Sequence, residues 1–80
     1  MRFVITGRKR SGPPWCYYVG RHGTITTTGA KAAVIIGLAE AKTELGYWRQ
    51  EARDYQWYLE KLPPRVPVAA AVLRAELIEV

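Results

Sequence analysis

The side chains that most often carry out catalysis are scarce in this sequence. It has one cysteine, Cys16, one histidine, His22, and one aspartate, Asp54. A nucleophile pair of Cys16 and His22 would need a strand end and a turn to converge, and no motif around either residue indicates that they do. The sequence also lacks a phosphate-binding P-loop and the GxGxxG and GxSxG motifs. We therefore predict a protein without enzymatic activity.

Metal and cofactor sites are not expected either. A tetrahedral zinc site needs four ligands at characteristic spacings, and this chain offers one cysteine and one histidine. We expect no metal and no cofactor. The protein should then act by binding a partner, and the partner's chemistry must be sought in the charged and aromatic residues.

Positive charge is concentrated in the N-terminal half of the chain. The formal net charge is +5. Residues 1–36 contain six basic residues and no acidic one, whereas residues 37–80 contain six basic and seven acidic residues. We expect the N-terminal half to form a cationic surface whatever its folded shape, which favours partners of negative potential. Its basic residues are Arg2, Arg8, Lys9, Arg10, Arg21 and Lys31.

The densest basic cluster, Arg8-Lys9-Arg10, is followed closely by aromatic residues. Its side chains and loop amides could hold phosphate oxygens. Trp15 or Tyr17 beside it could stack on the bases of a single-stranded nucleic acid. The alternatives are that the cluster is a solubilising loop and that the aromatics pack in the core. Tyr17 and Tyr18 point to opposite faces of a strand, so we expect one of them in the core and the other exposed.

A second group of aromatic residues lies between positions 47 and 58, on a segment that we predict to be helical. Tyr47, Trp57 and Tyr58 fall outside the apolar face of that helix. Aromatic residues off the core face are enriched at protein interfaces, so we predict that these three anchor a protein partner. The alternative is that Trp57 and Tyr58 pack under the 63–67 loop or against a second copy of the chain.

The elements that must position these residues begin with a set of strands. Residues 1–8 alternate in the manner of a strand, with Phe3 and Ile5 on one face. Residues 15–19 and 24–28 flank a glycine-containing turn, which predicts a hairpin. Residues 31–36 form an apolar run that fits a short buried strand or the start of a helix equally well.

The clearest periodic pattern predicts a helix that begins after Gly37 and ends at Pro63-Pro64. Gly37 is a tolerable N-cap, and Glu40 is spaced to reach back to its amide. Gly46 should weaken the middle of the helix by about 1 kcal/mol relative to alanine. An apolar seam runs along the segment for about six turns. The seam comprises Leu38, Ala41, Leu45, Trp48, Ala52, Tyr55, Leu59 and Leu62.

The C-terminal segment is predicted to close the fold. The closing segment is residues 68–80, which alternate as a last strand would from Val72 onward, whereas its alanine-rich beginning, residues 68–72, could instead be helical. We thus expect one domain, residues 1–80, of the α+β class. Its predicted architecture is an antiparallel sheet of three to four strands packed on one long amphipathic helix, in the order ββ(β)αβ.

The cellular setting is predicted from cysteine usage and hydropathy. A single cysteine allows no internal disulfide, which is typical of a reducing compartment. The N-terminus becomes polar too early for a signal peptide, and no apolar run is long enough to span a membrane. We expect a soluble, cytoplasmic protein.

The layout of these segments resembles small accessory proteins of phages and mobile elements. It is carried by Phe3-Val4-Ile5, by Tyr17-Tyr18-Val19-Gly20 with the Thr-rich turn, by Lys31-Ala32-Ala33-Val34, by Glu40-Ala41 opening a helix, and by the final Glu79-Val80. In size and element order the chain is similar to anti-CRISPR proteins of type I systems, among them the type I-C group.

The resemblance implies a stoichiometric inhibitor in a bacterial cytoplasm, a monomer or weak homodimer that binds the Cascade effector and blocks its engagement of target DNA. Many such inhibitors are acidic DNA mimics, and the basic half of this chain departs from that pattern. For this chain the resemblance therefore implies contact with an acidic or mixed protein surface of the effector. The alternative hypothesis is a small nucleic-acid-binding module that uses the N-terminal hairpin region.

Overall fold

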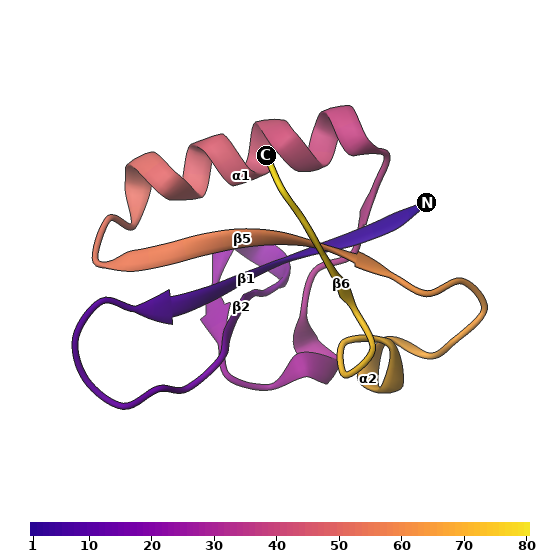
Figure 1. Ribbon diagram of the computed structural model, residues 1–80, viewed down its shortest axis with the longest axis horizontal. Coiled ribbons are helices and arrows are strands. Elements are labelled where there is room, and N and C mark those ends of the chain that lie inside the picture. The colour runs from indigo at the N-terminus through magenta and orange to yellow at the C-terminus, as the bar shows by residue number, and fades with distance from the viewer.

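A long antiparallel pair of strands, β1 and β5, forms the centre of the computed structural model, which describes residues 1–80 (Figure 1). The strands are β1 (Arg2–Lys9), β2 (Tyr17–Val19), β3 (Ile25–Thr26), β4 (Ile35–Ile36), β5 (Tyr55–Leu62) and β6 (Glu76–Ile78). The helices are α1 (Leu38–Glu51) and α2 (Val68–Ala71), and short 3-10 turns occupy Arg21–Gly23 and Gly29–Lys31. These elements form one six-stranded sheet with helices on both faces.

The sheet has the strand order β3-β2-β1-β5-β6, and all its pairings are antiparallel. On one side, β1 pairs with β5 along its whole length, from Arg2 opposite Leu62 to Lys9 opposite Tyr55. On the other side, β1 pairs with two short strands in succession, β4 near its start and β2 near its end. Strand β1 is therefore paired along both edges.

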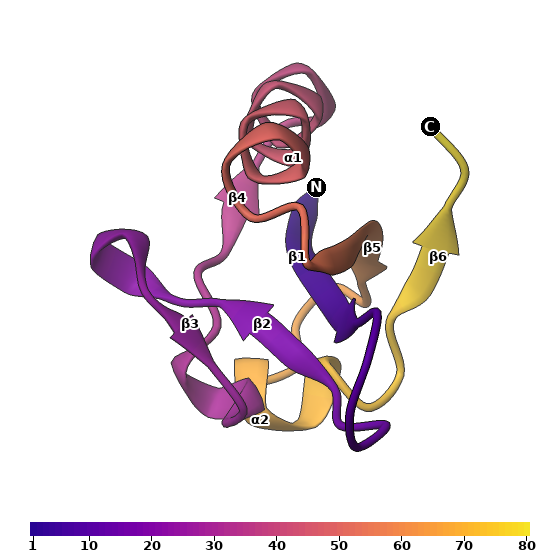
Figure 2. The same ribbon diagram turned by 90° about the vertical axis from the view of Figure 1, so that its left-hand side faces the viewer.

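The larger hydrophobic core lies between the sheet and helix α1, which runs along β5 (Figures 1 and 2). Alternate residues of the two central strands point toward the helix, so that both contribute large apolar side chains to one face. The buried residues of this core are Phe3, Ile5, Val19, Ala41, Leu45, Trp48, Trp57 and Leu59. The three buried residues of α1 belong to the predicted seam, whereas Leu38, the fourth seam residue on this helix, is 41% exposed.

A smaller core covers the opposite face of the sheet. It consists of Val4, Ala32, Leu62 and Ala71, with α2 and the Gly29–Lys31 turn packed beneath the strands (Figure 2). Because this face is also buried, Val4 is as inaccessible as its neighbours Phe3 and Ile5. The three consecutive apolar residues at the chain start therefore belong to a strand buried on both faces, as is typical of a central position.

The predicted long helix is wrong in its second half. Helix α1 ends at Glu51, and Ala52–Asp54 turn the chain so that residues 55–62 return as strand β5. Spacings of three and four cannot by themselves separate a helix from a strand whose two faces are both apolar. Pairing with β1 determines that residues 55–62 form a strand, because β5 supplies an eight-residue hydrogen-bonded ladder that a helix could not supply.

Several smaller predictions are settled by the structure. The β2–β3 hairpin is confirmed. Residues 31–36 begin with the last residue of the Gly29–Lys31 3-10 turn and end with strand β4.

Helix α1 begins after Gly37 as predicted, with φ of 94° at that glycine. The Gly37 amide donates to the carbonyl of Met1 at 3.3 Å, and no side chain caps the helix, so the cap predicted for Glu40 is not formed. Residues 68–71 are helical, and the last strand is confined to Glu76–Ile78.

The α+β class is confirmed, but the sheet has six strands rather than three to four. The additional strands are the short β4 and the central β5, which was expected to be helical. The longest helix has 14 residues, and none has the length and hydropathy needed to cross a membrane.

Two glycines test how tightly the α1-side core is packed. A Cβ atom at Gly7 would lie 2.6 Å from the ring of Trp57, whereas one at Gly46 on α1 would meet nothing within 4 Å. We expect Gly7→Ala to lower the free energy of unfolding by about 1–3 kcal/mol through overpacking. We expect Gly46→Ala to raise it by about 1 kcal/mol through helix propensity. Urea unfolding of both variants measures these changes in free energy. Equal changes of the same sign would contradict the packing described.

Candidate binding surfaces

The end of strand β1 carries the most ordered combination of cationic and aromatic side chains. The ammonium of Lys9 lies 5.9 Å from the ring centroid of Tyr17 and 5.8 Å from that of Tyr55. The two rings meet edge to face with centroids 5.2 Å apart. Distances of this size allow cation–π attraction, so Lys9 is held over both rings while its side chain remains exposed. Nearby in the chain, Trp15 is 59% exposed. We call Lys9, Arg10, Trp15 and Tyr17 the strand-end surface.

Arg10 is fixed against the turn that precedes β5. Its backbone amide donates to the carbonyl of Asp54 at 2.9 Å, and its Nε donates to the carbonyl of Arg53 at 2.9 Å. These bonds join the loop after β1 to the loop before β5. Arg10 and Arg53 thereby bring two exposed basic side chains to the same end of the sheet.

Arg8 belongs to a different environment, on the opposite face of the sheet from Lys9. The pKa of Arg8 is raised, chiefly because its guanidinium hydrogen-bonds to Cys16. The neighbouring Tyr18 has its pKa raised to about 12, mainly by burial and further by a hydrogen bond with Cys16. The carboxylate of Glu60 acts electrostatically on both groups. The sequence cluster Arg8-Lys9-Arg10 is thus divided between two faces.

The predicted cationic surface of the N-terminal half is interrupted by acidic residues of the C-terminal half. Because β5 pairs with β1, it carries Glu60 to a position opposite Val4 and near Arg8. Helix α1 places Glu44 in the same pocket as Arg21 and His22. Charges separated along the sequence are therefore interleaved in space.

A second basic region is a polar hollow of about 470 Å³ at the β2–β3 hairpin, and no acidic residue lines it. The side chains of the basic residues that line this hollow make no hydrogen bond within the protein. The hollow is lined by Arg21, His22, Thr24, Thr26 and Lys31. We call this region the hairpin hollow.

Arg2 is a structural residue rather than a surface cation. One terminal nitrogen of its guanidinium donates to the carbonyls of Pro63 at 2.6 Å and Val66 at 2.8 Å. These bonds tie the start of β1 to the loop between β5 and α2. The prediction that Arg2 contacts a partner is not supported by this geometry, because its donors are directed at the protein's own backbone.

The three aromatic residues predicted to anchor a protein partner differ in how far they are exposed. Tyr47 remains on α1 and is 55% exposed. Trp57 is 2% exposed, and its indole nitrogen donates to the carbonyl of Ala52 at 3.0 Å, so the prediction of a surface anchor there is wrong. Tyr58 is half-buried on β5, opposite Thr6. The error follows from the predicted helix, since in a strand Trp57 alternates into the core.

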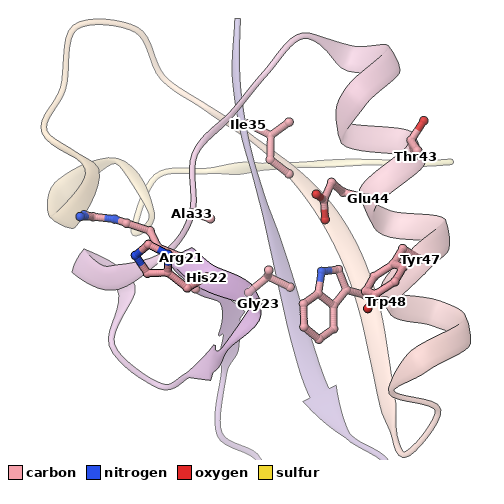
Figure 3. A pocket seen from close by; sticks show the side chains of 11 residues that line it. Arg21, His22, Gly23, Ala33, Ile35, Thr43, Glu44, Tyr47 and Trp48 are labelled. Atoms are coloured by element: carbon pink, nitrogen blue, oxygen red, sulfur yellow. The ribbon is translucent and has the colours of Figure 1, made fainter.

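One pocket was not predicted from the sequence. It has a volume of about 420 Å³ and lies between α1 and the segments that follow β2 and precede β4 (Figure 3). Trp48 forms part of its wall, and the indole nitrogen of Trp48 is buried without a hydrogen-bond partner. The pocket unites residues from three distant stretches of the chain, and no local motif signals it. We call it the Trp48 pocket.

Neither a metal centre nor a cysteine–histidine pair is assembled. No group of three or more His, Cys, Asp or Glu side chains is placed to hold a metal ion. Cys16 precedes β2 and His22 follows it, so an extended strand separates them.

Replacing Arg2 should reveal its structural role. We expect Arg2→Ala to lower the free energy of unfolding by about 1.5–3 kcal/mol, because two part-buried carbonyls lose a charged donor. The matched variant Arg21→Ala removes the same side chain from the exposed hairpin and should change stability by less than about 0.5 kcal/mol. Thermal and urea unfolding measure both. A similar loss of unfolding free energy in the two variants would show that the hydrogen bonds of Arg2 do not stabilise the fold specifically.

The raised pKa of Tyr18 predicts a loss of stability at high pH. The folded state holds the phenol proton more tightly than the unfolded state, in which the pKa is about 10. Unfolding therefore releases a proton between about pH 10 and the folded pKa of about 12, and the free energy of unfolding falls as pH rises. Tyr18→Phe should flatten this dependence and the exposed-site control Tyr47→Phe should retain it, as measured by urea unfolding from about pH 9 to about pH 11. Parallel curves for all three proteins would contradict the assignment.

Comparison with known proteins supplies no relative from which to transfer a function. No protein-family model matches the sequence, and neither the curated proteins nor the solved structures contain a significant match. Function must therefore be argued from the surfaces described above.

Proposed function

We propose that this protein acts by stoichiometric, non-catalytic binding, and that its strand-end surface contacts a partner of negative potential. The observation that carries the proposal is the placement of Lys9 over the Tyr17 and Tyr55 rings. A cation held in place loses little conformational freedom when it meets an anionic group. The exposed Trp15, two residues before Tyr17 in the chain, supplies the kind of apolar contact that dominates many interfaces.

The specific form that we propose is an inhibitor of a type I CRISPR effector in a bacterial cytoplasm. It rests on the resemblance in size and element order to type I anti-CRISPR proteins. Exposed apolar side chains near the start of α1 are compatible with a protein partner, since Ile36 is 62% and Leu38 is 41% exposed. In this form the chain covers an acidic or mixed surface of Cascade, and the effector no longer engages its target DNA.

A second candidate function is binding of single-stranded nucleic acid. It is favoured by one specific observation, that an exposed tryptophan, Trp15, follows the exposed Lys9 and Arg10 closely in the chain. An aromatic platform beside basic side chains is the usual means of holding a strand without sequence preference. In this form the same surface is used, but the negative groups are phosphates.

The inhibitor proposal is tested with purified type I effector and its target duplex. We expect a stoichiometric amount of the chain to reduce the fraction of DNA bound in a gel-shift assay. The double variant Lys9→Ala/Trp15→Ala should weaken inhibition by at least about tenfold, because it removes the ordered cation and the apolar anchor. The control Leu73→Ala/Arg74→Ala changes one exposed apolar and one basic residue elsewhere and should inhibit as the unaltered chain does.

The same materials separate the two candidates. Direct titration of a labelled single strand at several salt concentrations should give weak binding if the partner is a protein. Tight binding to the strand alone would instead support the nucleic-acid module, provided that its log affinity falls by about 0.7 per phosphate contact for each tenfold rise in salt. Undiminished DNA binding by the effector at excess chain would reject the inhibitor form.

A further inference from the structure

The Trp48 pocket contains a hydrogen-bond donor that the protein itself does not use. Trp48 is 8% exposed, and its Nε1 has no partner. The other tryptophan of the core, Trp57, satisfies its Nε1 with the carbonyl of Ala52. A buried N–H without a partner costs free energy, and such groups are rare in native proteins. An acceptor supplied by a ligand would remove that cost.

The walls of the pocket are suited to a flat apolar ring. Val19, Ala33 and Ile35 form an apolar side, and Tyr47 and Trp48 form an aromatic one. The rings of Tyr47 and Trp48 meet edge to face, with centroids 5.5 Å apart and an interplanar angle of 87°. The volume of about 420 Å³ falls within the range of small-ligand sites.

The polar groups of the pocket are few and directional. Glu44 and Trp48 both line the pocket, and both side chains are labelled in Figure 3. The lining therefore includes a carboxylate acceptor and an indole with an unpartnered N–H donor. A ligand that satisfies both must present a hydrogen-bond acceptor next to one or more donors along one edge.

The Trp48 pocket and the hairpin hollow share two lining residues, Arg21 and His22. In Figure 3 the Arg21 side chain extends away from Trp48. His22 has a left-handed backbone, with φ of 64°, and Gly23 follows with φ of 70°. The turn is held by Thr24, whose hydroxyl donates to the Arg21 carbonyl at 2.9 Å and whose own carbonyl accepts from Gly20 at 2.7 Å. A turn with a fixed backbone thus presents exposed basic side chains beside an aromatic pocket.

We propose that the Trp48 pocket binds the base of a purine nucleotide and that the hairpin hollow binds its phosphate. The base lies against the aromatic wall and offers its acceptor to the Trp48 N–H and its donors to Glu44. The phosphate meets Arg21 and Lys31, where no acidic side chain competes. This site is separate from the strand-end surface and goes beyond the function proposed for it.

Guanine satisfies the pocket most completely. Its O6 accepts, and its adjacent N1–H and N2 amino group donate, so one edge serves the indole N–H and both carboxylate oxygens. Adenine offers one amino donor and one ring acceptor, which uses a single carboxylate oxygen. Uracil presents one donor between two acceptors and has a smaller ring to fill the pocket. The expected order of affinity is guanine, then adenine, then uracil.

The nucleotide has two possible sources with the same chemistry, a free nucleotide and a residue of a single-stranded RNA. Both place a base and a phosphate in the two cavities. Guanosine monophosphate and a short guanine-containing RNA strand are therefore the two probes, with inorganic phosphate as a third titrant that lacks the base.

The test uses the indole N–H resonances in nitrogen-15 NMR spectra of the full chain. Its three tryptophans, Trp15, Trp48 and Trp57, give separate probes in the strand-end surface, the pocket and the core. We expect guanosine monophosphate to shift the Trp48 resonance in a saturable manner while those of Trp15 and Trp57 stay in place. Inorganic phosphate alone should leave Trp48 unchanged. Absence of a saturable Trp48 shift with both the nucleotide and the RNA strand would overturn the proposal.

Variants distinguish specific recognition from general attraction to charge. Glu44→Gln should lower the affinity for guanosine monophosphate by about tenfold or more, since the amide retains the shape of the side chain but exchanges one acceptor for a donor. The matched control Glu40→Gln, one helical turn earlier and outside the pocket, should bind as the unaltered chain does. Equal weakening in both, or none in either, would contradict the base-recognition geometry.

The source of the nucleotide follows from the same titrations. Saturation by guanosine monophosphate with an affinity equal to that of the RNA strand supports a free nucleotide. A Trp48 shift that appears only with the strand supports a residue of RNA. Arg21→Ala removes a cation from the hollow but leaves Glu44 and Trp48 in place, so it should weaken binding of the nucleotide more than binding of guanosine. Equal weakening of the two ligands would reject the hairpin hollow as the phosphate site.

Discussion

The eight-residue antiparallel ladder between β1 and β5 is the interaction on which the rest of the structure depends. It places Trp57 and Leu59 beside Phe3 and Ile5, and these side chains make the surface on which α1 lies. The same ladder leaves Val4 and Leu62 on the other face, where α2 covers them. A single pairing thus creates both cores. Its close fit is visible at Gly7, where the ring of Trp57 occupies the space of a side chain.

The ladder also determines which charges can act together. It brings the carboxylate of Glu60 near Arg8, so that an acidic group of the C-terminal half acts on an arginine of the N-terminal half. At the other end it sets Tyr55 beside Lys9, which gives the strand-end surface its ordered cation. Position along the chain was therefore a poor guide to the electrostatic surface, because β5 carries acidic residues from the C-terminal half into the centre of the sheet.

Local patterns predicted those parts of the fold that local interactions decide. The alternation of β1, the β2–β3 hairpin and the start of α1 at Gly37 all depend on neighbouring residues. The segment 55–62 does not, since its aromatic and apolar residues suit one face of a helix or both faces of a strand. Its conformation follows from a partner more than forty-five residues away, which no periodicity contains. The predicted roles of Trp57 and Arg2 failed for the same reason, whereas Tyr47, on a correctly predicted helix, remained exposed.

The contrast between the two core tryptophans connects packing with function. Trp57 and Trp48 lie with ring centroids 5.6 Å apart in one cluster, yet only Trp57 has its indole nitrogen satisfied. A fold of this size could satisfy both or replace Trp48 with an apolar residue that has no donor to leave unpaired. The unsatisfied donor lies instead where the core opens into a cavity bordered by Glu44 and the hairpin cations. Buried polar groups left unpaired next to a cavity are best explained by what enters the cavity.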